Sequence, residues 1–420
     1  MFNSIILDKS AFESLNIDEI FFLHQYYFPI VPHILIIEIL ADLKAEKAGR
    51  DSQERVKQLA YKILQLNPKY TAHYQGLIEH ELRGEIVEMG RRPNVGHAKS
   101  VISDEGQKGV VIKDQFEEEM LDRWRSNKFE EAERFSAEEW RKSIEGNKID
   151  HSGFDRPEKI KELKNLGDVL EFVDSYLKAQ ASQRNIFTNA ISLYRISPLV
   201  ASELFYKLET GEITSLYETA PYCYFCYRIF LVFSLALARG LITARQTDII
   251  DLQYLYYLPF TSLFSSDDKF HKMLTPLFLD SDQTFITGED LKSDLRRLVE
   301  LRDEQDTDKQ STWVQKHRQY PPDIASSFTT EMWLKNVPKN VRQAETFPSD
   351  LTPEQQRKIV EKTNRLSKSA ENPNQTEPFS DEDTDFIIIE RKVRGSDFCP
   401  CRSGKLFKDC CLDRVMKKNT

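Results

Sequence analysis

The chain has 420 residues, of which 40% are hydrophobic and 30% are charged, and its formal net charge is −9. The length predicts two or three domains, and the hydrophobic fraction is sufficient for a sizeable core. The negative balance excludes a surface that is basic over its whole extent, although a local basic groove stays compatible with it. The first ten residues show no basic stretch followed by a long apolar one. We therefore expect no signal peptide, a cytoplasmic location and reduced cysteines.

The most apolar segment is IFLVFSLALA at 229–238, which lies between Arg228 and Arg239. A helix that crosses a bilayer needs about 20 apolar residues. We interpret the segment as a buried helix and expect no membrane association.

The first 48 residues alternate between strand and helix patterns. Residues 3–7 (NSIIL) predict a buried strand, and 18–27 have a helical pattern. Residues 28–32 (FPIVP) predict a second strand, and 33–47 a second helix. This order is typical of a parallel α/β sheet with helices on its faces.

More strands of that sheet are expected in the segment 223–302. We predict a helix at 247–258 and a strand at 259–264. A second helix is predicted at 271–279, a second strand at 283–287 and a closing helix at 288–304. The two halves are separated by 49–222, whose mostly helical patterns predict a long insertion.

Two other segments have a different composition. Residues 84–109 hold five of the 15 glycines, which favours a loop or an ordered excursion over a helix. Residues 303–384 are rich in proline, small polar residues and acids, and predict a partly ordered connector.

Four of the six cysteines lie in FCPCRSGKLFKDCC at 398–411. Cys399 and Cys401 are one residue apart, and Cys410 and Cys411 are adjacent. Four thiolates complete a tetrahedral zinc shell with no open position, so such a site is structural, and metal binding would fold a module too small for its own core. The alternative is four unligated or oxidised thiols.

This spacing, C-P-C-x-S-G-K-x-F-K-x-C-C, resembles the SEC-C motif. The resemblance implies a small zinc-binding module over 385–420 that docks a protein or the ribosome, with the four cysteines as Zn²⁺ ligands. Arg402 stands where the family usually has glycine, which affects the turn and no ligand. The remaining pair, Cys223 and Cys226, lies among aromatic and apolar residues and is interpreted as structural.

Several carboxylates occupy positions where a parallel sheet builds its sites. Asp8 follows the first strand, and Asp268 or Asp267 follows the strand at 259–264. In parallel α/β sheets, ligands bind at the carboxyl ends of strands.

Helices supply the other carboxylates. Glu38 interrupts the apolar HILIIEIL, where a charge is costly unless it is used or paired. Asp251 lies near the start of a predicted helix, with Asp248 three residues earlier on the same face. Carboxylates brought together repel one another unless a divalent cation lies among them, and oxygen ligands of this kind suit Mg²⁺ or Mn²⁺.

Each acid also has a structural explanation. These are a helix cap for Asp8, a paired or edge-exposed position for Glu38, the helix dipole for Asp248 and Asp251, and a turn for Asp267 and Asp268.

The stretches IILDKSAF, PIVPHILIIEIL and DLQYLYYLPFTSLFSSDDKFH resemble PIN-domain ribonucleases. The resemblance implies a PIN-like fold made from 1–48 and 223–302, in which Mg²⁺ or Mn²⁺ supports hydrolysis of RNA. Its acidic positions fall on Asp8, Glu38, Asp251 and Asp268, with Asp267 as the alternative to the last. The long insertion departs from the usual family pattern.

Two other functions stay open. One is a catalytically inactive PIN-like scaffold that its zinc tail recruits to ribosomes or another assembly, and the negative net charge favours it slightly. The other is cleavage of DNA, because no residue reports on a 2′-hydroxyl. His271 follows the acidic turn, where it either assists catalysis or packs at a helix start.

Overall fold

The computed structural model describes residues 3–44, 51–90, 98–102, 108–112, 116–146, 162–243, 245, 247–318 and 320–336. They belong to two compact units, the first of Met1–Gly96 with Asp114–Asp350, and the second of His97–Lys113 with Leu351–Thr420. The predicted zinc module at 385–420 and the connector beyond residue 336 lie outside the described residues.

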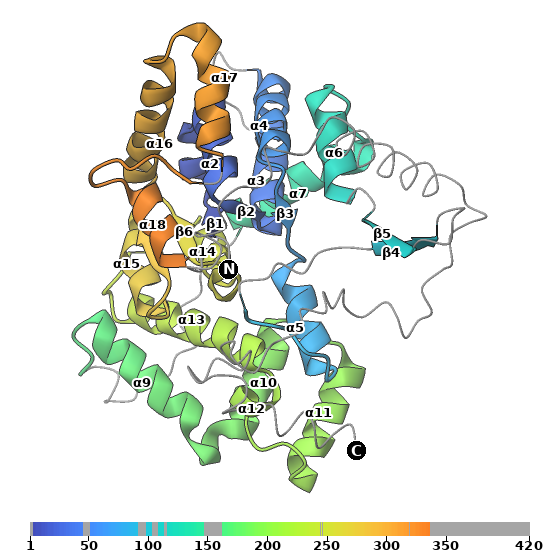
Figure 1. Cartoon of the computed structure of the whole chain (residues 1–420). Helices are drawn as coiled ribbons and strands as arrows, with labels where there is room; N and C mark the ends of the chain where they lie inside the picture. The colour runs from blue at the N-terminus through green and yellow to red at the C-terminus, as the bar shows by residue number, and fades with distance from the viewer. Residues whose placement is uncertain are drawn as a thin grey trace. The chain divides into compact units, whose positions relative to one another are not determined.

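The first unit contains a five-stranded sheet in which every pair of neighbouring strands is parallel. Its order is β3-β2-β1-β6-β7. The strands are β1 (Ser4–Leu7), β2 (Phe28–Val31), β3 (Lys69–Tyr70), β6 (Leu263–Ser265) and β7 (Thr284–Ile286). The predicted mixed α/β architecture with a parallel sheet is confirmed (Figure 1).

The strand order contains a switch point between β1 and β6. The chain adds β2 and β3 on one side of β1, and then returns to add β6 and β7 on the other side. Ile5 pairs with Leu263 and Leu7 with Ser265, so the two central strands end at the same level. In such sheets the helices that follow the two strands lead to opposite faces, which opens a crevice at their carboxyl ends.

Side-chain caps stabilise the starts of the first two helices near this crevice. Asp8 caps α1 (Lys9–Ser14), and Asn16 and Glu19 form a capping box at α2 (Ile17–Tyr26). Helix α3 (His33–Ala41) follows Pro32 and continues into a 3₁₀ turn. Helices α14 (Asp248–Leu255), α15 (Lys269–Leu274) and α16 (Gly288–Asp303) flank the later strands.

Two of the predicted boundaries are wrong, and proline explains both. Leu258–Phe260 forms a 3₁₀ turn, so β6 begins at Leu263 and not at residue 259. Thr275–Leu277 forms another, so α15 ends at Leu274 and not at residue 279. Pro259 and Pro276 lack the backbone N–H that a strand ladder or a helix interior requires.

The segment 49–222 is mainly helical in its described part, as predicted. Its helices are α4 (Ser52–Leu66), α5 (Tyr74–Leu82), α6 (Phe116–Arg125), α7 (Glu131–Gly146), α9 (Leu166–Lys178), α10 (Gln183–Leu193), α11 (Pro198–Thr210), α12 (Leu216–Thr219) and the start of α13 (Pro221–Ala238). The sheet nevertheless takes β3 from this segment, and the connection from β2 to β3 contains α3 and α4.

The glycine-containing segment 84–109 contains no helix in its described part, as expected. Strands β4 (Ala98–Ile102) and β5 (Lys108–Ile112) form an antiparallel pair within the second unit. After α16, the first unit continues with α17 (Thr307–Lys316) and α18 (Phe328–Asn336), which both pack against α16.

Helix α13 contains the apolar segment that we interpreted as buried. Among the described helices it is the one whose length and composition would suit a membrane span, but 67% of it is buried inside the protein. Cys223 and Cys226 on this helix are fully buried, as predicted for structural cysteines. The backbone N–H groups of Tyr222 and Cys223 at its start donate to the buried carboxylate of Glu81 on α5, at 3.0 and 2.8 Å.

Candidate functional site

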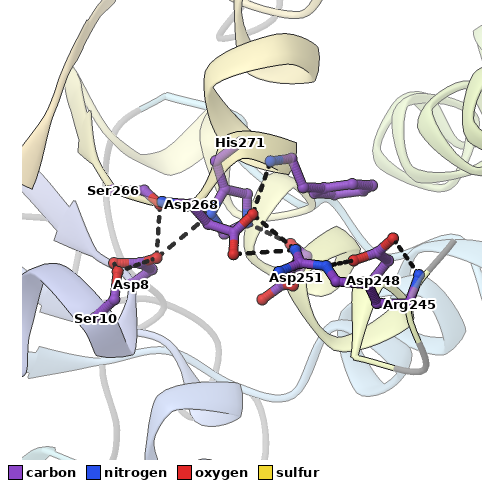
Figure 2. A network of polar contacts seen from close by, with 9 residues as sticks. Asp8, Ser10, Arg245, Asp248, Asp251, Ser266, Asp268 and His271 are labelled. Carbon is purple, nitrogen blue, oxygen red and sulfur yellow. Dashed lines mark hydrogen bonds and ion pairs between the residues drawn. The ribbon is translucent and has the colours of Figure 1, made fainter. Parts of the chain in front are cut away.

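The ends of the two central strands are joined by a hydrogen bond between side chains. The hydroxyl of Ser266, the first residue after β6, donates to Oδ2 of Asp8 across 2.6 Å (Figure 2). Asp8, which follows β1, is 4% exposed and also accepts from the backbone N–H of Ala11 and the hydroxyl of Ser10, at 2.8 and 2.9 Å. Asp8 therefore caps α1, which is the structural explanation considered for it above. It also contacts the loop that follows β6.

His271 on α15 connects Asp8 to α14. The ring is fully buried, with Nδ1 2.8 Å from the hydroxyl oxygen of Ser266 and 3.5 Å from Oδ2 of Asp8. Its Nε2 lies 2.7 Å from the backbone carbonyl oxygen of Asp251. A carbonyl oxygen only accepts, so Nε2 carries a proton, and Nδ1 donates to Ser266 when the ring is doubly protonated.

The pKa values of this pair agree with an imidazolium facing a carboxylate. Burial raises the pKa of Asp8, but the hydrogen bond and charge of His271 outweigh it, and the net pKa is lowered. Burial lowers the pKa of His271, but the contacts with Asp8 and Asp251 outweigh it, and the net pKa is raised. His271 is thus a packed residue, and in its protonated form it is an ion-pair partner of Asp8.

Three more of the predicted acids surround the side chain of Arg245, which precedes α14. Asp248 accepts from the backbone N–H and from Nε of Arg245, at 2.8 and 3.0 Å. Both carboxylate oxygens of Asp268 lie within hydrogen-bonding distance of its Nη2, at 2.9 and 3.0 Å, and Oδ2 of Asp251 lies 3.7 Å from the same nitrogen (Figure 2). The structure therefore brings Asp248, Asp251 and Asp268 together around one guanidinium.

Glu38 reaches the same region from α3. The buried hydroxyl of Tyr254 on α14 donates to Oε2 of Glu38. Burial is the main cause that raises the pKa of Glu38 to about 7; Asp251 and Asp8 add to it, while Tyr254 and Lys9 oppose it. The ring of Tyr254 also lies 5.8 Å from that of His271, which contacts Asp8, so Glu38 and Asp8 are connected through these two rings.

Asp251 has a similar electrostatic environment. Burial is again the main cause that raises its pKa, to about 7, with the charges of Asp268 and Asp248 adding to it. His271 and Arg245 oppose the rise but do not cancel it. Because burial is the main cause, the raised pKa means that Asp251 takes up a proton more readily than a solvent-exposed aspartate.

Asp267 points to a different element. Its Oδ1 accepts from the backbone N–H of Glu289 at 3.2 Å, in the first turn of α16, and lies 3.7 Å from Nζ of Lys272. Of the two alternatives left open by the sequence, only Asp268 shares Arg245 with Asp248 and Asp251.

The sequence analysis missed three residues that contact the acids of the site. Ser266 follows an apolar strand as Asp8 does, which was a usable signal. Tyr254 lies three residues after Asp251 on the same helix face, which was a weaker one. Arg245 precedes the helix in a segment without a regular pattern, so only the tertiary structure reveals it.

The donor set fits a hard divalent cation in its chemistry. In the described part of the chain no group of three or more His, Cys, Asp or Glu side chains is arranged to hold a metal ion. Asp8, Glu38 and Asp268 are instead engaged by Ser266, Tyr254 and Arg245. All the clustered acids nevertheless offer carboxylate oxygens, and their mutual repulsion is what a divalent cation relieves.

Comparison with known proteins identifies one short region. The family model of the SEC-C motif matches residues 396–413, which include Cys399, Cys401, Cys410 and Cys411. No curated protein and no solved structure matches the chain significantly. These cysteines lie outside the described residues. The chain carries a SEC-C motif, and this motif is generally zinc-binding.

Proposed function

We propose that this protein is a metal-dependent nuclease of PIN-like fold that hydrolyses phosphodiester bonds in RNA. The observation that carries the proposal is the convergence of Asp8, Glu38, Asp251 and Asp268 at the carboxyl ends of β1 and β6. The order of the acids along the chain and the resemblance to PIN-domain ribonucleases also support it.

The four acids would hold Mg²⁺ or Mn²⁺. When bound, such a cation supplies an activated water and stabilises the charge that develops on a phosphodiester. The chain's own residues orient the ligands: Ser10, Ser266 and His271 fix the carboxylate of Asp8, and Tyr254 fixes that of Glu38.

The SEC-C motif adds a recruitment function to this proposal. Cys399, Cys401, Cys410 and Cys411 would bind one Zn²⁺ and fold a tail that docks a protein or the ribosome. The catalytic proposal does not depend on that tail.

The test is cleavage of end-labelled single-stranded RNA, and of DNA of the same sequence, with Mn²⁺ or Mg²⁺. Wild type is compared with Asp8→Asn and with Asp18→Asn, an exposed acid outside the cluster. Metal-dependent cleavage of RNA that is lost only in Asp8→Asn supports the proposal. Equal cleavage by wild type and Asp8→Asn contradicts the site, and preferential cleavage of DNA contradicts the substrate.

A catalytically inactive scaffold is the second candidate. The contact of Arg245 with Asp248 and Asp268 favours it, because a resident guanidinium already neutralises part of the cluster. No cleavage by wild type on a varied RNA pool, with folded and zinc-loaded protein, would favour this candidate.

A further inference from the structure

We infer that Arg245 is a displaceable cation of the acidic cluster: its guanidinium holds the place of a divalent metal at Asp251 and Asp268, and is released toward the substrate phosphate when the metal binds. The inference rests on the proposed function and concerns the regulation of the same site.

Arg245 combines contacts with a buried acid and a largely exposed guanidinium. Its backbone N–H and Nε are bound to Asp248, which is only 2% exposed. Only Nη2 reaches Asp268 and Asp251, and the side chain of Arg245 is 55% exposed. The guanidinium is one rigid plane, so Nη2 leaves Asp268 when the whole group turns away, while the bond from the backbone N–H to Asp248 keeps Arg245 beside the site.

Guanidinium and metal would compete for the same oxygens. Both oxygens of Asp268 lie within 3.0 Å of Nη2, and Oδ1 also accepts from the backbone N–H of Phe270 at 2.7 Å. Mg²⁺ binds carboxylate oxygens at about 2.0–2.1 Å, and a guanidinium at the same oxygens would add repulsion between the two cations. Metal binding at Asp268 consequently favours the turned-out position of Arg245.

A released Arg245 would have a suitable partner in the substrate. Arginine binds phosphate oxygens through two parallel N–H donors, and phosphate is the group that such a nuclease must bring next to the acids. Asp248 is then a positioning residue for Arg245 and not a metal ligand. This reassigns one of the acids that the sequence suggested for the metal.

The experiment measures Mn²⁺ binding to the full-length, zinc-loaded protein by titration calorimetry. It compares wild type, Arg245→Ala and Arg245→Gln with Arg296→Ala, which removes a side chain of similar exposure (56%) that pairs with a buried carboxylate outside the cluster, that of Glu19. Asp268→Asn identifies the Mn²⁺ site. Circular dichroism checks the fold of each variant, and either Arg245 variant suffices.

We expect both Arg245 variants to bind Mn²⁺ about tenfold more tightly than wild type, because a charge-assisted contact no longer competes. Arg296→Ala should bind as wild type does. If nuclease activity is present, the Arg245 variants should also show a higher KM for RNA.

The outcomes separate the inference from the proposed function. Equal or weaker Mn²⁺ binding in the Arg245 variants, with binding lost in Asp268→Asn, overturns the inference and leaves the nuclease site in place. No Mn²⁺ binding in any protein overturns the proposed function. Mn²⁺ binding only after Arg245 is replaced would mean that the metal does not displace Arg245 in the wild type, which overturns the inference and favours the inactive scaffold.

Discussion

The hydroxyl of Ser266 donates to the carboxylate of Asp8 across 2.6 Å and so joins the residues that follow the two central strands. The same hydroxyl oxygen lies 2.8 Å from Nδ1 of His271 and 3.0 Å from the backbone N–H of Asp268. The hydroxyl of Ser266 thus contacts Asp8, His271 and the backbone of Asp268 at the same time.

Ser266→Ala should therefore lower the free energy of unfolding by about 1–3 kcal/mol, because Nδ1 of His271 and the N–H of Asp268 lose a buried partner. Urea unfolding measures the loss. Ser202→Ala is the control, since its hydroxyl bonds only the carbonyl of Pro198 on the exposed side of α11, and it should change the value by less than about 0.5 kcal/mol. Equal midpoints for Ser266→Ala and wild type would contradict the role of Ser266.

Two buried tyrosine hydroxyls differ in their partners and should differ in their contribution to stability. That of Tyr254 donates to Glu38, whereas that of Tyr70 finds no hydrogen-bond partner within the described part of the chain. Tyr254→Phe should cost about 1–2 kcal/mol, and Tyr70→Phe should be neutral or stabilising. Parallel denaturation curves provide the measurement, and a larger loss for Tyr70→Phe than for Tyr254→Phe would contradict the assigned bond.

Local patterns were sufficient to predict the elements that carry most of the site. The apolar run before Asp8 and the helix around Glu38 have signals that do not depend on distant residues, and both are confirmed. Strand β3 could not be predicted, because two residues show no periodicity and its place depends on pairing with β2.

The contacts within the site depended on the tertiary structure. Asp267 and Asp268 are adjacent and chemically identical, and only the fold turns one toward α16 and the other toward Arg245. The bond from Tyr254 to Glu38 joins residues 216 positions apart. A single sequence shows the candidate acids but not which of their neighbours neutralise them.

Glu81 predicts a pH dependence of stability outside the acidic cluster. Burial raises its pKa to about 7 from the ordinary 4.5, although the backbone N–H groups of Cys223 and Tyr222 oppose the rise. A carboxyl whose folded pKa is raised stabilises the fold fully below its unfolded pKa, and this contribution is lost as the pH rises through the folded pKa. The wild type should therefore lose roughly 3 kcal/mol between about pH 4 and pH 8 from this group.

Glu81→Gln removes this titration, so its free energy of unfolding should depend less on pH over that range. Chemical denaturation at a series of pH values measures the difference. Glu79→Gln alters an exposed acid on the same helix and should keep the wild-type slope. A Glu81→Gln profile parallel to that of wild type would mean that Glu81 titrates normally.

The SEC-C match predicts one structural zinc per chain. Cys410→Ser should remove it, because three thiolates no longer complete the shell, whereas Cys226→Ala should retain it because that thiol is buried in α13. Atomic emission on purified protein measures the metal content. Equal zinc in the Cys410→Ser variant and wild type would contradict the assignment of the ligands.

Asp267 and Asp268 should respond differently to the same substitution. Asp267 accepts from a backbone N–H at the start of α16, so Asp267→Asn should cost about 1 kcal/mol of stability and leave Mn²⁺ binding unchanged. Asp268→Asn should abolish Mn²⁺ binding, because it removes a proposed ligand.

Gly288 offers a second test of the position of Asp267. A Cβ at residue 288 would clash with Oδ2 of Asp267 and would lie 2.9 Å from Cβ of Ala11. Gly288→Ala should therefore displace Asp267 and destabilise the protein by about 1–3 kcal/mol, again without weakening Mn²⁺ binding. The opposite result would be loss of Mn²⁺ binding in Gly288→Ala or Asp267→Asn and retained binding in Asp268→Asn. It would identify Asp267 as the ligand, because the contacts of the two acids assign that role to Asp268.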